Sequence, residues 1–115
     1  MVDIFKALSE QSRLRILSLL LEHESCVCEI EACLNMTQSN ASRHLAALKN
    51  SGILIGFKDA QWTYYKINER FVKENGELWE YLKRMLKELP SYQSDIGQFL
   101  KCQGQGLCSN QKRAH

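Results

Sequence analysis

The stretch 37–54, TQSNASRHLAALKNSGIL, carries the signals of one helix with a defined start and a defined end. Thr37 belongs to a residue type that caps helix N-termini, and Gly52 suits the left-handed conformation that closes a helix. Three apolar residues recur between them at helical spacing: Ala41, Leu45 and Leu48. We therefore expect an amphipathic helix that buries this stripe and turns its polar side chains outward.

A second helix is predicted immediately before this one. Ser25 is a candidate N-cap, and four apolar residues follow it at helical spacing: Val27, Ile30, Cys33 and Leu34. Asn35 then suits the left-handed residue that ends a helix, just before Thr37. Two helices joined by so short a turn predict a helix-turn-helix.

Both flanks of this pair also have clear patterns. Residues 5–23, FKALSEQSRLRILSLLLEH, are helical in periodicity and divide near Ser9, a candidate cap, into a short first helix and a longer second one. On the other side, ILIGFK (53–58) and WTYYKIN (62–68) are rich in β-branched and aromatic residues and flank the polar turn DAQ. That arrangement predicts a β-hairpin.

One long and one short helix are expected after the hairpin. The long helix ends before Pro90 and carries an apolar stripe: Leu78, Leu82, Met85 and Leu89. The short helix covers about 92–101. The order predicts a mainly α fold with a small β-hairpin wing, a winged helix-turn-helix of α-α-α-α-β-β-α-α order. We expect one domain over 1–101 and a flexible tail over 102–115.

In a winged helix-turn-helix, the helix beginning at Gln38 enters the DNA major groove with its first residues nearest the base edges. Ser39 and Arg43 point away from the buried stripe, and polar residues flank them, while His44 lies at the edge of the stripe as a packed or phosphate-touching residue. The predicted DNA contacts, including two residues near the wing tip, are Thr37, Gln38, Ser39, Asn40, Ser42, Arg43, His44, Lys58 and Gln61. An ordinary polar helix face would look similar, but the helix-turn-helix order and the hairpin favour DNA.

Composition narrows the function classes. The 115 residues carry a formal net charge of +2, with four basic and one acidic side chain in the middle segment 37–68. No apolar run has membrane length and no leader resembles a signal peptide, so we expect a cytoplasmic protein that does not enter a membrane. No catalytic triad, phosphate loop or carboxylate pair is evident, and a thiol oxidoreductase would need a Cys-x-x-Cys on a βαβ frame. We therefore do not expect an enzyme.

Four stretches together resemble, in order and spacing, the ArsR/SmtB family of bacterial metal-responsive repressors: FKALSEQSRLRIL, SCVCEI, TQSNASRHLAALKNSGIL and WTYYKI. The resemblance covers roughly 4–90. It implies a homodimer, bound to double-stranded operator DNA with an imperfect palindrome, whose interface is formed by the first and long penultimate helices. The expected interface residues are Phe5, Leu78, Leu82, Met85 and Leu89.

The chain also departs from the family pattern. Glu10-Gln11-Ser12 stands where the family often has Asp-Pro-Thr, and Ala60 stands where it has a glycine at the wing turn. The wing lacks the usual additional basic residues, which argues against strong wing contacts. The long helix has no histidine, so the site of the zinc-sensing branch is missing.

Cys26 and Cys28 resemble the metalloid-sensing box of the arsenic- and cadmium/lead-responsive members. Thiolates are soft ligands, and a helix N-terminus favours the thiolate form. In a regular helix the two residues differ by ~200° and ~3 Å of rise. Bonds of ~2.3 Å to one ion require sulfurs within about 4 Å of each other. Chelation therefore has to distort the first turn of the helix that supports the DNA-reading helix.

The remaining cysteines divide into one core residue and two candidate ligands. Cys33 completes an apolar stripe and is expected in the core. Cys102 and Cys108 could complete the metal site, or they could be incidental exposed thiols or a disulfide. The predicted inducer is As(III) or Sb(III), bound by three thiolates and controlling arsenic-resistance genes. The alternatives are a Cd(II)/Pb(II)-responsive repressor that uses all four thiolates and a repressor switched by thiol-disulfide chemistry.

Overall fold

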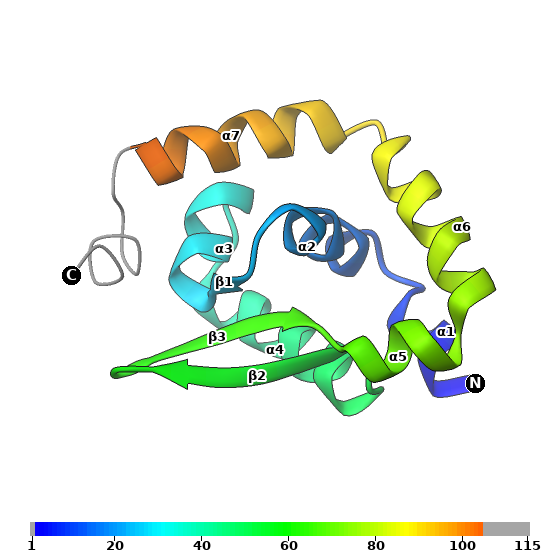
Figure 1. Cartoon of the computed structure of the whole chain (residues 1–115). Coiled ribbons are helices and arrows are strands. Elements are labelled where there is room, and N and C mark those ends of the chain that lie inside the picture. Colours follow the sequence, from blue (N-terminus) through cyan, green and yellow to red (C-terminus); the bar gives the residue numbers. More distant parts are fainter. Residues whose placement is uncertain (1, 105–115) are drawn as a thin grey trace.

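The computed structural model describes residues 2–104, with side chains as far as Lys101. Four helices precede the hairpin: α1 (Val2–Ala7), α2 (Gln11–Glu22), α3 (Val27–Leu34) and α4 (Gln38–Asn50). Helix α2 lies at the centre of the helical body, and the hairpin projects from that body (Figure 1). No helix in the described part of the chain is both long enough and apolar enough to span a bilayer.

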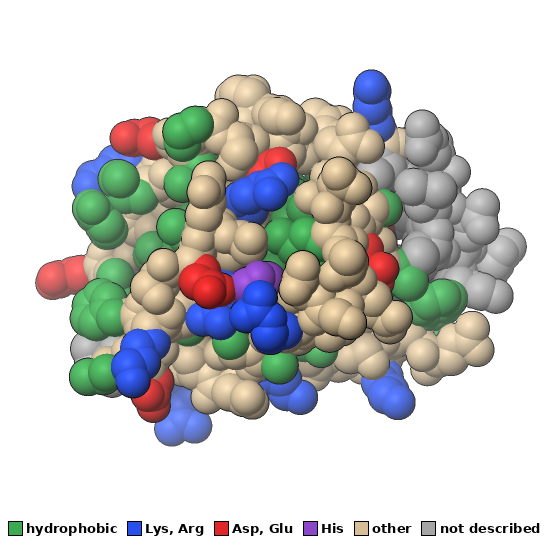
Figure 2. All heavy atoms as spheres, turned by 180° about the vertical axis from the view of Figure 1, so that it is seen from behind, with side chains coloured by type: hydrophobic (Ala, Val, Ile, Leu, Met, Phe, Trp, Pro, Cys, Tyr) green, Lys and Arg blue, Asp and Glu red, His purple; other side chains and the backbone are tan. Residues whose placement is uncertain are grey.

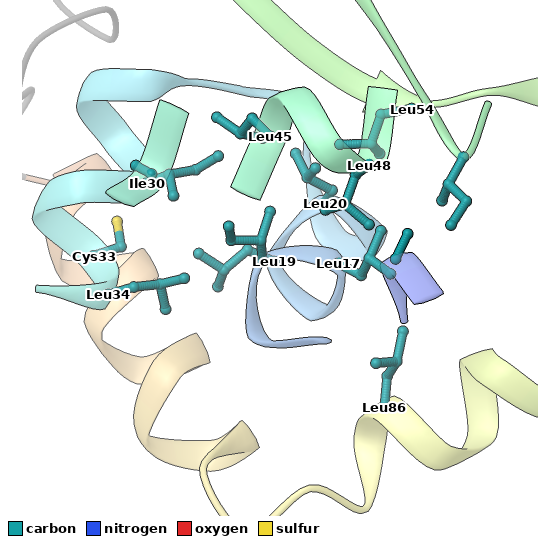
Figure 3. Close-up of a cluster of buried hydrophobic side chains, with 14 of the residues drawn as sticks. Leu17, Leu19, Leu20, Ile30, Cys33, Leu34, Leu45, Leu48, Leu54 and Leu86 are labelled. Atoms are coloured by element: carbon teal, nitrogen blue, oxygen red, sulfur yellow. The ribbon is translucent and has the colours of Figure 1, made fainter. Parts of the chain in front are cut away.

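The core is formed where α2, α3 and α4 meet (Figure 3). Leu17 and Leu19 of α2 are fully buried, as are Leu45 and Leu48 of α4. Cys33 is 4 % exposed and lies at the edge of the same cluster, so its predicted place in the core is confirmed.

Local sequence signals explain the helix-turn-helix. Asn35 ends α3 in the left-handed conformation, with φ 56° and ψ 51°. The Thr37 hydroxyl accepts a hydrogen bond from the Asn40 backbone N–H at 3.2 Å and so caps α4. Gly52 follows α4 with φ 89°, where a side chain would be strained. The predicted helix-turn-helix boundaries are confirmed at these three residues.

The wing is a sheet of three strands rather than a hairpin alone. Strand β2 (Leu54–Asp59) pairs antiparallel with β3 (Trp62–Ile67) around a two-residue turn, in which Ala60 has φ 59°. A third strand, β1 (Ser25–Cys26), pairs with the other edge of β3, so that the strand order is β1-β3-β2. Ser25 therefore lies in a strand, and Cys26, not Ser25, is the N-cap of α3.

The predicted long helix is interrupted. It forms α5 (Glu69–Glu74) and α6 (Gly76–Lys87), which are separated at Asn75, where φ is −131° and ψ is 46°. The last helix, α7 (Tyr92–Gly104), continues beyond the predicted end at 101. The second helix also starts differently from the prediction. Its N-cap is Glu10, while the Ser9 hydroxyl donates to the Lys6 carbonyl at 2.6 Å.

Helix α7 is fixed against the helical body by polar contacts. The Arg15 guanidinium donates two hydrogen bonds of 2.9 Å to the buried Asp95 carboxylate, which raises the pKa of Arg15. The Tyr92 hydroxyl donates to the Glu22 carboxylate at 2.8 Å. These contacts place α7 across α2 and α3 (Figure 1).

Candidate nucleic-acid interface and thiol site

The outer face of α4 presents short polar side chains and one arginine. Thr37 and all the predicted contact residues of the helix except His44 are exposed: Gln38, Ser39, Asn40, Ser42 and Arg43. Lys58 and Gln61 are exposed near the turn of the wing. Figure 2 shows basic side chains spread over one face of the molecule with acidic ones among them, rather than a single basic patch. The surface suits hydrogen bonding to bases better than bulk attraction to phosphates.

His44 does not belong to that exposed face. It is 4 % exposed, and its Nδ1 accepts a hydrogen bond from Arg13 Nε at 3.2 Å. Burial lowers the pKa of His44, the Arg43 and Arg13 charges lower it further, and Glu10 opposes them. Since the neutral ring is favoured and its Nδ1 accepts from Arg13, the proton is on Nε2, which lies 3.4 Å from an Arg43 guanidinium nitrogen and cannot accept a hydrogen bond from it. The structure thus shows His44 as a packed residue, and its contact with DNA stays a prediction.

Cys26 occupies a junction between two elements. It is 1 % exposed, it belongs to β1, and it caps α3. Cys26 and Glu29 form a reciprocal capping box, in which the Cys26 backbone N–H donates to Glu29 Oε1 at 3.1 Å and the Cys26 side chain accepts from the Glu29 backbone. The prediction that both cysteines lie within one regular helix is therefore wrong, because only Cys28 is helical.

The two cysteines line one small pocket of about 200 Å³. Its wall comes from the start of α3, the start of α4 and the first residues of β3: Cys26, Val27, Cys28, Glu31, Gln38, Trp62 and Thr63. Cys28 is half-buried and is the more accessible of the two thiols. Two buried polar atoms around the site, Glu29 Oε2 and Trp62 Nε1, have no hydrogen-bond partner among the described residues.

Two of the four predicted metal ligands, Cys26 and Cys28, lie in one pocket. The side chain of Cys102 in α7 and the whole of Cys108 lie outside the described part of the chain. Among the side chains that are described, no group of three or more His, Cys, Asp or Glu residues is placed to hold a metal. The two thiols nevertheless fit a thiophilic ion in chemical type, since they share one pocket.

A separate apolar groove of about 300 Å³ lies between α1 and α6. Three of its side chains are exposed for their type: Phe5 at 54 %, Tyr81 at 50 % and Met85 at 38 %. Sequence reasoning missed Tyr81, since the predicted stripe followed leucine and methionine only. Leu78 and Leu89 are half-buried, whereas Leu82 is 7 % exposed and packs in the monomer core. Leu82 nevertheless also lines the groove, so its predicted place at the interface stays a prediction.

The fold and its polar helix face define a winged helix-turn-helix of the kind found in transcription regulators. The family model described as "Bacterial regulatory protein, arsR family" matches residues 10–55. HlyU from Vibrio cholerae, a solved structure, is 37 % identical with a TM-score of 0.59, and the match covers 70 % of this chain and 88 % of that one. The chain belongs to the arsR family, which consists of transcription regulators and not of enzymes.

Two further relatives are informative. The arsenic resistance transcriptional regulator ArsR2 of Pseudomonas putida is 43 % identical over 67 residues, which are 57 % of this chain and 58 % of that protein. The chain thus spans little more than half the length of that relative. The homodimeric winged helix-turn-helix DNA-binding domain Mb0332 of Mycobacterium bovis is 28 % identical with a TM-score of 0.62, over 77 % of this chain and 83 % of that one.

Proposed function

We propose that this protein is a homodimeric, cytoplasmic DNA-binding repressor of arsenic-resistance genes that leaves its operator when As(III) or Sb(III) binds Cys26 and Cys28. One observation supports the proposal above all. The pocket that joins the two thiols is also lined by Gln38, the first residue of the helix that faces DNA. A ligand that reshapes this pocket therefore acts directly beside the start of α4.

Recognition of DNA is assigned to α4 with a modest contribution from the wing. Arg43 is exposed on the outer face of α4. Its guanidinium can donate two hydrogen bonds to a guanine edge in the major groove. Lys58 and Gln61 lie where a wing reaches the DNA backbone, and a single lysine near the tip supplies little charge.

The apolar groove between α1 and α6 is assigned to a second copy of the chain. Phe5, Tyr81 and Met85 expose apolar surface together beside the groove, and a regulator of palindromic DNA needs two helices α4. The homodimeric state of the Mycobacterium bovis relative supports this assignment.

The dimer is tested by Met85→Glu, because a carboxylate in the groove is disfavoured once the groove is covered. Sedimentation should show monomers for this variant and dimers for the control Lys87→Glu, which changes an exposed residue of the same helix. A dimeric Met85→Glu protein would remove this groove from the interface.

Arsenic binding requires ligand exchange and no change of oxidation state. Each thiol replaces one hydroxide of As(OH)₃, an S–As bond forms as an As–O bond breaks, and the thiol proton leaves with the hydroxide as water. Cys28 is accessible enough to react first, and Cys26 follows. Cys102 or Cys108 supplies the third thiolate in this proposal.

A titration of the reduced protein with arsenite tests the ligand set through the ultraviolet absorption of thiolate–arsenic bonds. We expect one ion per subunit, loss of the signal in Cys28→Ser, and an unchanged signal in Cys33→Ala, whose thiol lies in the core. A preference for cadmium or lead with four thiolates per ion would replace arsenic as the inducer. A protein that responds only to oxidant would be a redox repressor.

A further inference from the structure

We propose that the thiol site signals to DNA through β3, the central strand of the wing, and not through a movement of α3 as a body. The inference rests on the proposed function and specifies its regulation. Cys26 lies in the sheet, beside β3, and the motif CVC alone gives no sign of this position.

Cys26 lies in a row of side chains that crosses all three strands. It is paired with Tyr64 of β3, and Tyr64 is paired with Phe57 of β2. Residues directly opposite each other in antiparallel strands share one face of the sheet. The side chain of Tyr64 therefore lies between those of Cys26 and Phe57. Tyr64 is fully buried and stacks on Phe57 with ring centroids 5.7 Å apart. A displacement of Cys26 therefore acts directly on Tyr64, its partner in the central strand of the wing.

Binding of a ligand by both thiols acts on Cys26 at this junction. The Cys26 side chain is 1 % exposed and already caps α3 in the reciprocal box with Glu29. A ligand that bonds to both sulfurs engages the sulfur that closes this box, on the residue that pairs with Tyr64, and in our proposal it draws Cys26 out of both contacts. Since β1 consists of only two residues, loss of Cys26 leaves nothing of this strand beyond Ser25.

The rest of α3 resists movement. Ile30 is fully buried and Leu34 is 2 % exposed, and both pack in the cluster that α4 also enters (Figure 3). Sliding α3 as a body would open this core, whereas releasing β1 leaves it intact. Release of the two-residue strand is therefore the less costly response to a ligand.

Trp62 is a second point at which the pocket meets the wing. It lies two residues before Tyr64 and so on the same face of β3, and it lines the pocket together with both cysteines. A ligand in the pocket therefore acts on β3 at Trp62 as well as through Tyr64.

The test uses a bridging reagent in place of the inducer. In the full chain carrying Cys33→Ala, Cys102→Ser and Cys108→Ser, only Cys26 and Cys28 remain as thiols. Dibromobimane bridges two such thiols: each thiolate displaces one bromide, and two C–S bonds replace two C–Br bonds. Monobromobimane bridges nothing, and at one equivalent, directed to the more accessible Cys28, it is the matched control. Amide hydrogen exchange is then compared for β3 and α4.

We expect bridging to speed exchange in β3 by about tenfold or more while the interior of α4, residues 41–48, keeps its rate. The monofunctional reagent should leave both segments unchanged. In a Trp79→Phe background, emission from Trp62 should shift to longer wavelength on bridging, because its indole becomes hydrated. An unchanged β3 in the bridged protein, an equal loss of protection in α4, or failure of the reagent to bridge the thiols would each overturn the inference.

The arsenite titration separates this inference from the proposed function. A protein that binds arsenite but shows no faster exchange in β3 after bridging keeps its proposed function and loses the wing route. A protein that opens β3 after bridging but does not bind arsenite keeps the wing route for another thiol-directed signal.

Discussion

Helix α4, which we propose faces DNA, and the thiol-bearing segment 25–28 meet at one pocket, yet they are held in place in different ways. Helix α4 is fixed by its own sequence, with the Thr37 cap at one end, Gly52 at the other and a buried leucine stripe between them. Segment 25–28 is fixed by exchangeable partners: Tyr64 across the sheet and Glu29 in the capping box. A helix capped at both ends and packed along a buried stripe suits recognition, whereas a two-residue strand held by one pairing suits a switch.

The comparison predicts that changes on α4 reduce DNA affinity without affecting induction. Arg43→Ala should weaken operator binding by ~1–3 kcal/mol if the guanidinium contacts a base, and the loss should be concentrated at one position of each half-site. Lys49→Ala, at an exposed position in the last turn of the same helix, is the control. Gel shifts on an operator selected from random duplexes measure both. An Arg43→Ala protein with unchanged affinity would exclude this residue from the interface, and a uniform loss across sequences would indicate a phosphate contact.

A smaller effect, on folding stability, is expected from His44, the buried histidine of α4. Burial lowers the pKa of His44 in the folded state relative to its ordinary value near ~6.5, and the charges of Arg43 and Arg13 lower it further against the opposing charge of Glu10. At a pH just below 6.5, His44 therefore binds a proton more readily in the unfolded chain than in the folded one. Folding stability should therefore fall as pH drops below about 6.5 and be fully present above it.

Urea unfolding at several pH values between 5 and 8 measures this dependence. His44→Gln removes the titrating group, so its stability should change less than that of the wild type as the solution is acidified. Equal slopes in the two proteins would show that other groups carry the pH dependence.

Much of the fold could be predicted because its signals are local. Asn35, Thr37 and Gly52 each fix a turn or cap within a few residues, and the alternation of 53–58 and 62–68 predicts the hairpin. The break at Asn75 also has a local signal, the Asn75-Gly76 pair, which the leucine spacing on either side obscured. The family resemblance likewise rested on contiguous motifs.

The thiol site could not be predicted in the same detail. A strand of two residues has no periodicity, and β1 exists only because β3 lies beside it. The role of Glu29 did have a signal, since an acidic residue three positions after a cap indicates a capping box. The burial of His44 and Leu82 depends on Arg13 and on the core around α2, which are distant in sequence.

The central claim, that Cys26 and Cys28 release the protein from DNA, is tested most directly by fluorescence anisotropy on a labelled operator under reducing conditions. Arsenite should weaken operator binding by the wild type by ~1–3 kcal/mol. By linkage, operator DNA should weaken arsenite binding by the same free energy. Cys28→Ser should bind DNA as the wild type does and stay bound after arsenite is added, while Cys33→Ala should respond normally. A Cys28→Ser protein that still leaves the operator on addition of arsenite would contradict the account.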